Sequence, residues 1–309
     1  MNDTLEAYQH VTVIGGGVIG ASWAALFLAK GLTVTVNDPL PDVDKRVHDQ
    51  LREAAPALKA LGLPTDGLDA NLRFEADLDR ALAEADAVQE NSPERLDFKQ
   101  DLFARVERAA RPDTLLMSST SGIPATEMAR SMKQPGRVVI GHPFNPPHLV
   151  PLVEVVPGKD TDPETVRRAV DFYTALGKQP QVLRKECPGF VANRLQAALF
   201  REAVNLVVQG VVTEQELDGI VTASIGLRWA VAGPFRSFHL GGGPGGLPAF
   251  MQHLAPGLES LWKDLGDPTF DEATVKLLSD QADFGASVEE LETARDQAQI
   301  KVMRVLGEA

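Results

Sequence analysis

The stretch HVTVIGGGVIG, residues 10–20, decides the fold. It places a short β-branched strand before three glycines with the spacing G-x-G-x-x-G, and an amphipathic helical pattern follows. The glycine motif alone is weak, but a strand before it and a helix after it are the context of a dinucleotide-binding turn. A glycine-rich turn in some other α/β fold is the alternative.

Each glycine of this turn has a predicted role. Gly15 permits the tight turn, Gly17 lets the backbone approach a pyrophosphate, and Gly20 allows the helix to pack closely on the strand. The pyrophosphate is expected at the positive N-terminus of the helix, which begins with Val18 and Ile19. We therefore predict that these five residues bind the cofactor.

Asp38 indicates which cofactor is bound. It ends the next β-branched run, 18 residues beyond Gly20, where a carboxylate accepts hydrogen bonds from the adenosine ribose hydroxyls. A 2′-phosphate would be repelled there, and the first basic residue after Asp38 is Lys45. The sequence thus favours NAD over NADP.

Short apolar runs alternate with longer helical patterns in the first part of the chain. The expected strands are His10–Ile14, Thr33–Val36, Ala87–Gln89, Thr114–Met117, Arg137–Ile140 and Leu152–Val156. The expected helices between them are Val18–Lys30, Asp42–Leu61, Glu94–Ala110 and Pro163–Leu176. This alternation predicts an α/β fold with a mostly parallel sheet covered on both faces, that is, a Rossmann-type domain.

Strand patterns stop after Pro188, and the remaining patterns are helical. The expected helices are Gly189–Gln209, one opened by the capping box of Thr213 and Glu216, then Asp271–Ala282 and Ser287–Gly307. Residues 241–246 are expected to form a plain glycine-rich loop. We predict an NAD-binding domain over residues 1–186 and an all-helical domain over residues 187–309.

Composition excludes several classes of protein. The chain has 309 residues, 44% of them hydrophobic, and a net charge of −13, which disfavours binding to nucleic acid or anionic membranes. No stretch is apolar enough to span a bilayer, and the polar N-terminus does not look like a signal peptide, so a cytoplasmic protein is expected. Cys187 is the only cysteine, so no intrachain disulfide can form.

A second constellation surrounds His142. This histidine lies in the segment GHPFNPP, residues 141–147, at the end of an expected strand, and Glu154 follows 12 residues later inside an apolar run. A carboxylate in such a run needs a partner, and a histidine oriented by a carboxylate is suited to take a proton from an alcohol. Two other interpretations stay open: a structural histidine with a surface glutamate, or a metal site formed with His148.

These residues resemble the 3-hydroxyacyl-CoA dehydrogenase superfamily, over nearly the whole chain to about Leu265. A strand-end serine precedes the family's histidine by 21 residues, as Ser121 precedes His142. The family's glutamate stands in a run like LVEVV, which matches Glu154, and its asparagine stands in PGFxxNR, which matches Asn193. The resemblance implies that His142 and Glu154 form the catalytic pair.

The resemblance also implies further site residues and no metal. Ser121 and Asn193 would hydrogen-bond the reacting oxygen, completing the catalytic set. Glu94 and Lys99 match the segment PExxxxK that contacts the nicotinamide end of the cofactor, and Ser119 replaces a cofactor-contacting asparagine of many members. The helical domain would complete the active site and form a homodimer.

Two departures from the fatty-acid branch bear on the substrate. That branch has a lysine-rich helical hairpin after the second strand. The corresponding segment here, Arg46–Asn71, is short and has a single lysine, Lys59. The segments GLRWA (226–230) and GPF (233–235) look more like L-gulonate 3-dehydrogenase, also known as lambda-crystallin, and L-carnitine dehydrogenase. We therefore expect NAD-dependent oxidation of a small free 3-hydroxy acid. The alternatives are an L-3-hydroxyacyl-CoA dehydrogenase and a non-catalytic NAD-binding protein of crystallin type.

Overall fold

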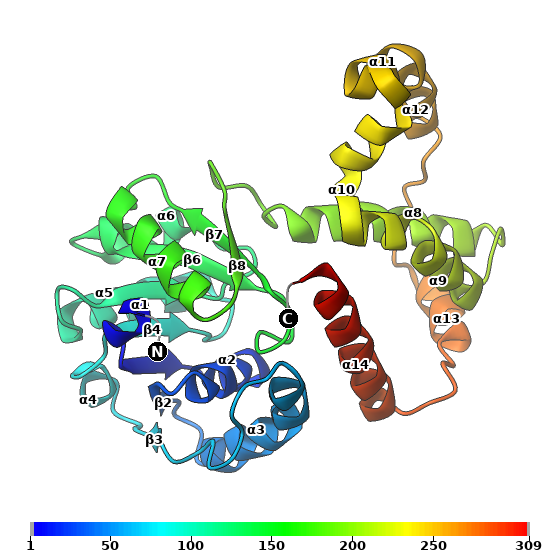
Figure 1. Cartoon of the computed structure of the whole chain (residues 1–309). Helices are drawn as coiled ribbons and strands as arrows, with labels where there is room; N and C mark the ends of the chain where they lie inside the picture. The colour runs from blue at the N-terminus through cyan, green and yellow to red at the C-terminus, as the bar shows by residue number, and fades with distance from the viewer. Residues whose placement is uncertain (1–2, 308–309) are drawn as a thin grey trace. The chain divides into compact units, whose positions relative to one another are not determined.

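The computed structural model describes residues 3–307 and contains two compact units (Figure 1). The first unit comprises the chain up to Phe190 together with the residues from Arg295 onward, and the second comprises Val191–Ala294. No described helix combines the length and the hydropathy needed to cross a bilayer. We describe each unit by itself.

The first unit is built on an eight-stranded sheet with the order β3-β2-β1-β4-β5-β6-β7-β8. The strands are β1 (His10–Ile14), β2 (Thr33–Asn37), β3 (Leu72–Phe74), β4 (Ala87–Glu90), β5 (Leu115–Ser118), β6 (Val138–Pro143), β7 (Leu152–Pro157) and β8 (Gln179–Val182). All neighbours pair in parallel except β6 and β7, which are antiparallel. The strand order reverses between β1 and β4, which is where open α/β sheets bind ligands.

Helices cover both faces of this sheet. They are α1 (Asp3–Glu6), α2 (Val18–Ala29), α3 (Val43–Ala60), α4 (Leu78–Leu82), α5 (Leu96–Ala109), α6 (Ala125–Met128) and α7 (Pro163–Ala175). Two short 3₁₀ turns follow α6, at Ala129–Ser131 and Pro135–Arg137. The predicted fold class, a Rossmann-type domain with a mostly parallel sheet followed by helices, is confirmed.

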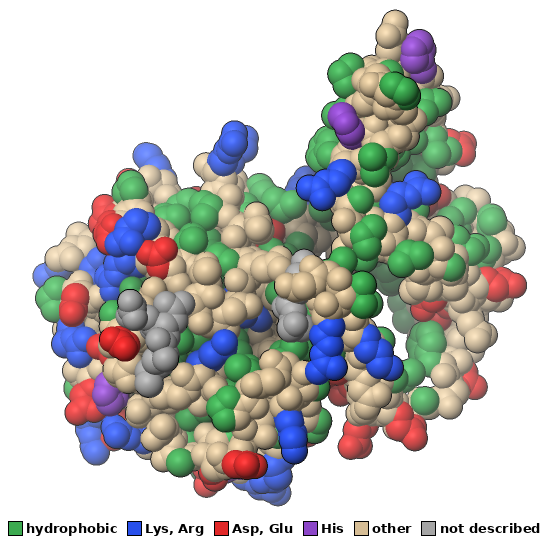
Figure 2. Space-filling model, viewed as in Figure 1, with side chains coloured by type: hydrophobic (Ala, Val, Ile, Leu, Met, Phe, Trp, Pro, Cys, Tyr) green, Lys and Arg blue, Asp and Glu red, His purple; other side chains and the backbone are tan. Residues whose placement is uncertain are grey.

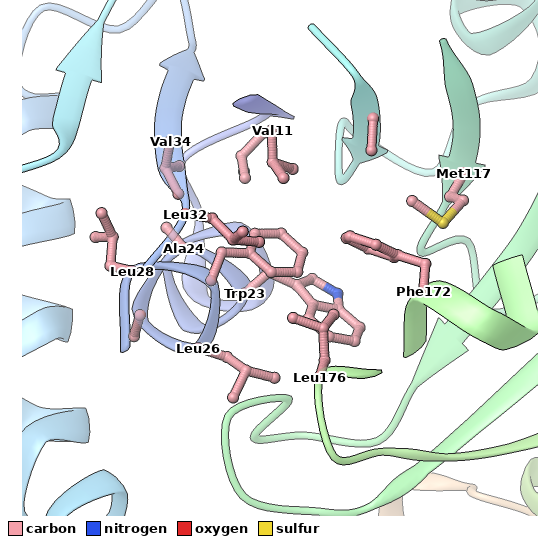
Figure 3. Packing of buried hydrophobic residues seen from close by; sticks show 14 of the residues in the cluster. Val11, Trp23, Ala24, Leu26, Leu28, Leu32, Val34, Met117, Phe172 and Leu176 are labelled. Atoms are coloured by element: carbon pink, nitrogen blue, oxygen red, sulfur yellow. The ribbon is translucent and has the colours of Figure 1, made fainter. Parts of the chain in front are cut away.

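The core has two layers because successive strand residues point to opposite faces. Leu115 and Met117 of β5 join the layer formed with α2 and α7, while Leu116 joins the layer formed with α5 and α6. Figure 3 shows Trp23 of α2 packed near Phe172 of α7. The first layer buries α2 from Gly20 to Ala29 without an exposed stripe, so the expectation of an amphipathic helix there was wrong.

The second unit contains helices only, among the residues that the structure describes. They are α8 (Ala192–Val208), α9 (Glu214–Ala223), α10 (Ile225–Gly241), a 3₁₀ turn (Gly243–Gly245), α11 (Gly246–His253), α12 (Ala255–Trp262), α13 (Glu272–Gln281) and the first part of α14 (Val288–Leu306). The predicted capping box of Thr213 and Glu216 is present at the start of α9. The glycine-rich segment 241–246, expected to be a plain loop, is a short connection between α10 and α11 that contains the 3₁₀ turn.

The last part of α14, from Arg295 onward, belongs to the first unit. From the sequence, all residues after 186 were expected in the helical domain. The α14 residues Ile300 and Met303 are buried against Ala57 of α3 and Leu149. Arg304 donates a hydrogen bond to the carbonyl of Ala60. The apolar face of the last helix thus closes over the end of α3, a contact that the local helical pattern cannot reveal. The boundary at residues 186/187 stays a prediction.

Candidate active site

The glycine loop lies at the end of β1, where the strand order reverses. Gly15 has a φ of +89°, and a Cβ atom built on it would lie 2.6 Å from the carbonyl oxygen of Asn91. A Cβ atom on Gly20 would lie 1.9 Å from the carbonyl oxygen of Gly15, so only glycine fits there. A Cβ atom on Gly17 meets nothing within 4 Å. The loop is therefore closed on the protein side and open at Gly17, which fits the approach of a dinucleotide pyrophosphate.

Asp38 is held against this loop. One carboxylate oxygen accepts a hydrogen bond from the backbone N–H of Gly16 (2.8 Å), and the other accepts from that of Leu40 (2.9 Å). Each carboxylate oxygen can accept a second hydrogen bond, so the group still has capacity for two ribose hydroxyls. The side chain is fixed next to the glycine turn, as the NAD interpretation requires.

Ser119, a predicted cofactor contact, is the centre of a hydrogen-bond network. Its hydroxyl accepts from Trp23 Nε1 (3.1 Å) and Gln89 Nε2 (2.8 Å), and donates to Asn91 Oδ1 (2.7 Å). Gln89 in turn accepts from the hydroxyl of Tyr173 (2.7 Å). The network joins the ends of β4 and β5 to α2 and α7. A direct contact between Ser119 and the cofactor stays a prediction.

Lys99 of α5, a predicted cofactor contact, is buried and paired with a carboxylate. Its Nζ lies 2.7 and 2.9 Å from the two carboxylate oxygens of Glu90, and the two side chains are only 1% and 0% exposed. Glu90 also accepts from Ser118 Oγ (2.5 Å). Glu90 was not predicted from the sequence. The available signal was its place directly after the expected strand Ala87–Gln89, because a carboxylate buried at a strand end needs a partner.

Glu94 organises the loop that follows β5. Its Oε1 accepts from the Thr120 hydroxyl and from the backbone N–H groups of Ser121 (3.0 Å) and Gly122 (3.2 Å). Its other oxygen lies 3.6 Å from Lys99 Nζ. Glu94 thus joins the buried ion pair to the segment that carries the predicted catalytic serine. Its own contact with the cofactor stays a prediction.

His142 and Glu154 face each other across β6 and β7. The antiparallel register pairs them directly, and His142 Nδ1 lies 2.9 Å from Glu154 Oε2. They are 5% and 2% exposed, and the rings of Phe144 and Phe190 lie 5.4 and 5.3 Å from the imidazole. The carboxylate occupies Nδ1, which leaves Nε2 for exchange of a proton with a ligand.

The metal-site alternative would need His148 beside His142 and Glu154. Within residues 3–307 no three His, Cys, Asp or Glu side chains come together in a way that could hold a metal ion. His148 is engaged elsewhere, because its Nδ1 lies 2.8 Å from Ser22 Oγ on α2.

The predicted serine and asparagine come from different parts of the fold. Ser121 follows β5, the strand beside β6, so it stands at the same carboxyl edge of the sheet as His142 and the glycine loop. Asn193 lies in the first turn of α8, in the second unit. The part that Asn193 plays beside His142 stays a prediction.

Comparison with known proteins identifies the family of the chain. Residues 10–187 match the model of the 3-hydroxyacyl-CoA dehydrogenase NAD-binding domain, and residues 189–276 match that of the C-terminal domain. An L-carnitine dehydrogenase of Streptomyces griseus is 44% identical over 98% of this chain and 91% of its own length. A 3-hydroxyacyl-CoA dehydrogenase of Gibberella moniliformis is 45% identical over 84% of this chain and 81% of its own.

A solved structure extends the likeness to three dimensions. The NAD⁺-dependent dismutase 5-formyl-3-hydroxy-2-methylpyridine 4-carboxylic acid 5-dehydrogenase superposes with a TM-score of 0.82 at 33% identity, covering 97% of this chain and 99% of its own. The glycine loop and Asp38 lie within the part of the chain that matches the NAD-binding domain, and both parts of the chain match one family. The chain is an NAD-dependent oxidoreductase that belongs to the 3-hydroxyacyl-CoA dehydrogenase family.

Proposed function

We propose that this protein oxidises a small free 3-hydroxy acid to the 3-keto acid, and that an acid like L-carnitine is its substrate. The observation that carries the proposal is the buried pair of His142 and Glu154 at the carboxyl edge of the NAD-binding sheet. A histidine oriented in this way is a general base for an alcohol.

The reaction removes a hydride from C3 and a proton from the hydroxyl group. NAD, when bound at the glycine loop, supplies the acceptor for the hydride. Nε2 of His142 takes the hydroxyl proton, and Glu154 holds the ring through Nδ1 and balances the positive charge that develops. Ser121 and Asn193 are the proposed donors to the oxygen as it becomes a carbonyl.

The segment after β2 favours a free acid over a CoA ester. It contains the single helix α3 and a short link to β3, with Lys59 as the only lysine in residues 46–71. Coenzyme A carries several phosphate charges, and a chain with a net charge of −13 and no basic docking helix there would repel it. The L-carnitine dehydrogenase relatives, which match nearly the whole chain, support the choice of substrate.

A trimethylammonium group would be held against an aromatic face, with about 0.5–2 kcal/mol per contact. Trp229, Phe235 and Trp262 are among the exposed aromatic side chains of the second unit. We propose that one or more of them contributes to recognition of the substrate.

A substrate screen tests the function. The formation of NADH is followed with L-carnitine, L-gulonate, 3-hydroxybutyrate and 3-hydroxybutyryl-CoA at equal concentrations. We expect the highest kcat/KM for a free acid. A far higher kcat/KM for the CoA ester would favour the alternative that the protein is an L-3-hydroxyacyl-CoA dehydrogenase, the activity named for the Gibberella moniliformis relative. No turnover of any of the four compounds would favour a non-catalytic NAD-binding protein.

Replacing the proposed base tests the mechanism. His142→Gln is expected to lower kcat by about 10²–10⁴-fold while the Kd for NAD stays unchanged, because the imidazole acts on the substrate proton. His48→Gln, at a partly exposed histidine on α3, is the matched control. Near-normal turnover of His142→Gln would refute the proposed role.

We also propose a homodimer formed through the second unit. Its helices expose large apolar side chains, and green side chains gather over them in Figure 2. Helices α8, α9 and α13 enclose a groove of about 400 Å³ lined by side chains such as Phe200, Leu217 and Phe284. The exposed apolar side chains grouped around this groove favour an interaction surface. Sedimentation equilibrium is expected to give twice the chain mass of 33.3 kDa, and a monomer at micromolar concentration would contradict the proposal.

A further inference from the structure

A second cavity lies in the first unit, at the C-terminal end of α2. It has a volume of about 160 Å³ and is bounded by the end of α2, the turn before β8, the loop around His148, and α14. Three basic side chains line it: Lys30, His148 and Lys178. None of its described lining residues is acidic, and most of the others are apolar.

Lys178 is a buried ammonium group without a carboxylate partner among the described residues. The residue is 6% exposed, and its Nζ donates to the backbone carbonyls of Pro147 and Val150. An ammonium group has three hydrogens, so one donor remains after these two bonds. Burial, together with the nearby charge of Lys30, lowers the pKa of Lys178 to about 7. Besides these carbonyls, Nζ lies 5.7 Å from the centroid of the Trp23 ring, and a bound anion would stabilise the charged form of Lys178 further.

His148 adds a second unused donor. It is 9% exposed, and its Nε2 has no hydrogen-bond partner in the described part of the chain. Ser22 Oγ accepts from the backbone N–H of His148 (3.0 Å), so its own hydrogen is free to donate to Nδ1 (2.8 Å). Burial lowers the pKa of His148 to about 4, so the ring is neutral near pH 7. In the tautomer in which Ser22 donates to Nδ1, the ring proton is on Nε2 and Nε2 is a donor.

Lys30 supplies the third basic group. Lys30 lies at the C-terminal end of α2. Its Nζ approaches Gly177, because a Cβ atom built on that glycine would lie 3.4 Å from the Nζ. The side chain forms no ion pair among the described residues, and burial lowers its pKa. Among the described residues, Asp296 is the acidic side chain whose charge raises the pKa of His148. Asp296 is itself paired with Arg295, at 2.8 Å. The cavity thus has an excess of positive charge and of hydrogen-bond donors.

We propose that this cavity is a binding site for a small carboxylate with a short apolar tail, separate from the active site. Its carboxylate accepts from Lys178, Lys30 and His148 Nε2, and its tail contacts side chains such as Leu61, Leu149 and Met303. The cavity is too small for a nucleotide, and its leucine-rich walls match an alkyl chain better than a bare phosphate.

The position of the cavity links it to the catalytic strand. Lys178 and His148 both hold the segment 145–150, which leads from the end of β6 to β7. A bound carboxylate would fix both side chains and so stabilise the segment that follows His142.

The test uses the full-length protein and butyrate as the probe, with chloride added to keep the ionic strength constant. The protein carries ¹³C-methyl methionine, and the Met303 signal, identified through Met303→Leu, reports occupation of this cavity rather than of the active site. We expect a saturable shift with a Kd in the millimolar range, and a rise in Tm because the ligand binds the folded state. Neutral butyramide, with the same shape, is expected to have no effect.

Variants locate the binding. Lys30→Gln and Lys178→Gln are expected to raise the Kd at least tenfold, whereas Lys133→Gln, at an exposed lysine of the same unit, leaves it unchanged. The Lys30 side chain has no hydrogen bond to the residues that the structure describes, so its variant remains informative if Lys178→Gln does not fold. Three results would overturn the proposal: no saturable Met303 shift, a Kd unaffected by the Lys30 change, or binding of inorganic phosphate at least as tight as that of butyrate.

Discussion

The buried ion pair between Lys99 and Glu90 gives the sharpest test of the site's architecture. Lys99→Met keeps the aliphatic stem and removes the charge. Glu90 is 0% exposed, so its carboxylate cannot gain water when the ammonium group is lost. Breaking a buried pair in this way costs about 3–5 kcal/mol. Glu90 keeps its hydrogen bonds from Ser118 and Ser92, so we expect a loss of about 3 kcal/mol, near the lower limit of that range.

A double-mutant cycle isolates the pair. Replacing both partners by neutral groups of similar size is often close to neutral, so Lys99→Met/Glu90→Gln is expected to be more stable than Lys99→Met alone. A coupling energy of about 2 kcal/mol or more follows. Lys133→Met, at an exposed lysine, is the control and should change the free energy of unfolding by less than about 0.5 kcal/mol.

The assay is urea unfolding followed by tryptophan fluorescence. The chain has three tryptophans, and Trp23 is the buried one in the first unit. In a background with Trp229→Phe and Trp262→Phe, the signal reports the first unit alone, and the unfolding free energies follow by linear extrapolation. A loss below about 1 kcal/mol for Lys99→Met, or a double variant no more stable than the single one, would refute this account of the pair.

The remaining predictions concern the loop, the cofactor and pH. The kcat/KM for NAD should far exceed that for NADP, and Asp38→Ala should narrow the difference; equal values in the unmodified protein would contradict the assignment of Asp38 to the ribose. Gly20→Ala places a Cβ atom 1.9 Å from the Gly15 carbonyl oxygen and should unfold or strongly destabilise the first unit, whereas Gly17→Ala should fold normally and bind NAD more weakly by calorimetry. Burial lowers the pKa of His148 from its ordinary value of 6.5 to about 4 in the folded protein. As pH falls, His148 therefore takes up its proton in the unfolded chain before it does so in the folded one. Up to about 3 kcal/mol of folding stability is lost between about pH 6.5 and pH 4. His148→Gln should remove that part of the pH dependence, and an unchanged slope would show that other groups cause it.

The sequence predicted the elements whose local pattern carries the signal. The six apolar strands were found because β-branched runs between turn residues have few other interpretations. It missed β3 (Leu72–Phe74) and β8 (Gln179–Val182), which are short, partly exposed and without an apolar run. The helices between Ile225 and Trp262 were also missed, since glycine and proline interrupt their pattern, as at the break before Pro234.

The sequence by itself determined the dinucleotide turn, because the requirements on Gly15 and Gly20 are local: a positive φ and a helix packed on its own strand. Tertiary structure decided the rest of the site. His142 and Glu154 are 12 residues apart, and the sequence alone left a pair, a metal site and two unrelated residues open. Only the antiparallel register of β6 and β7 places the two side chains opposite each other. Likewise, Lys99 of α5 can be buried only because the carboxylate of Glu90, at the end of β4, is its partner. The packing of the helix on the sheet sets that partner, and the neighbours of Lys99 in the sequence do not.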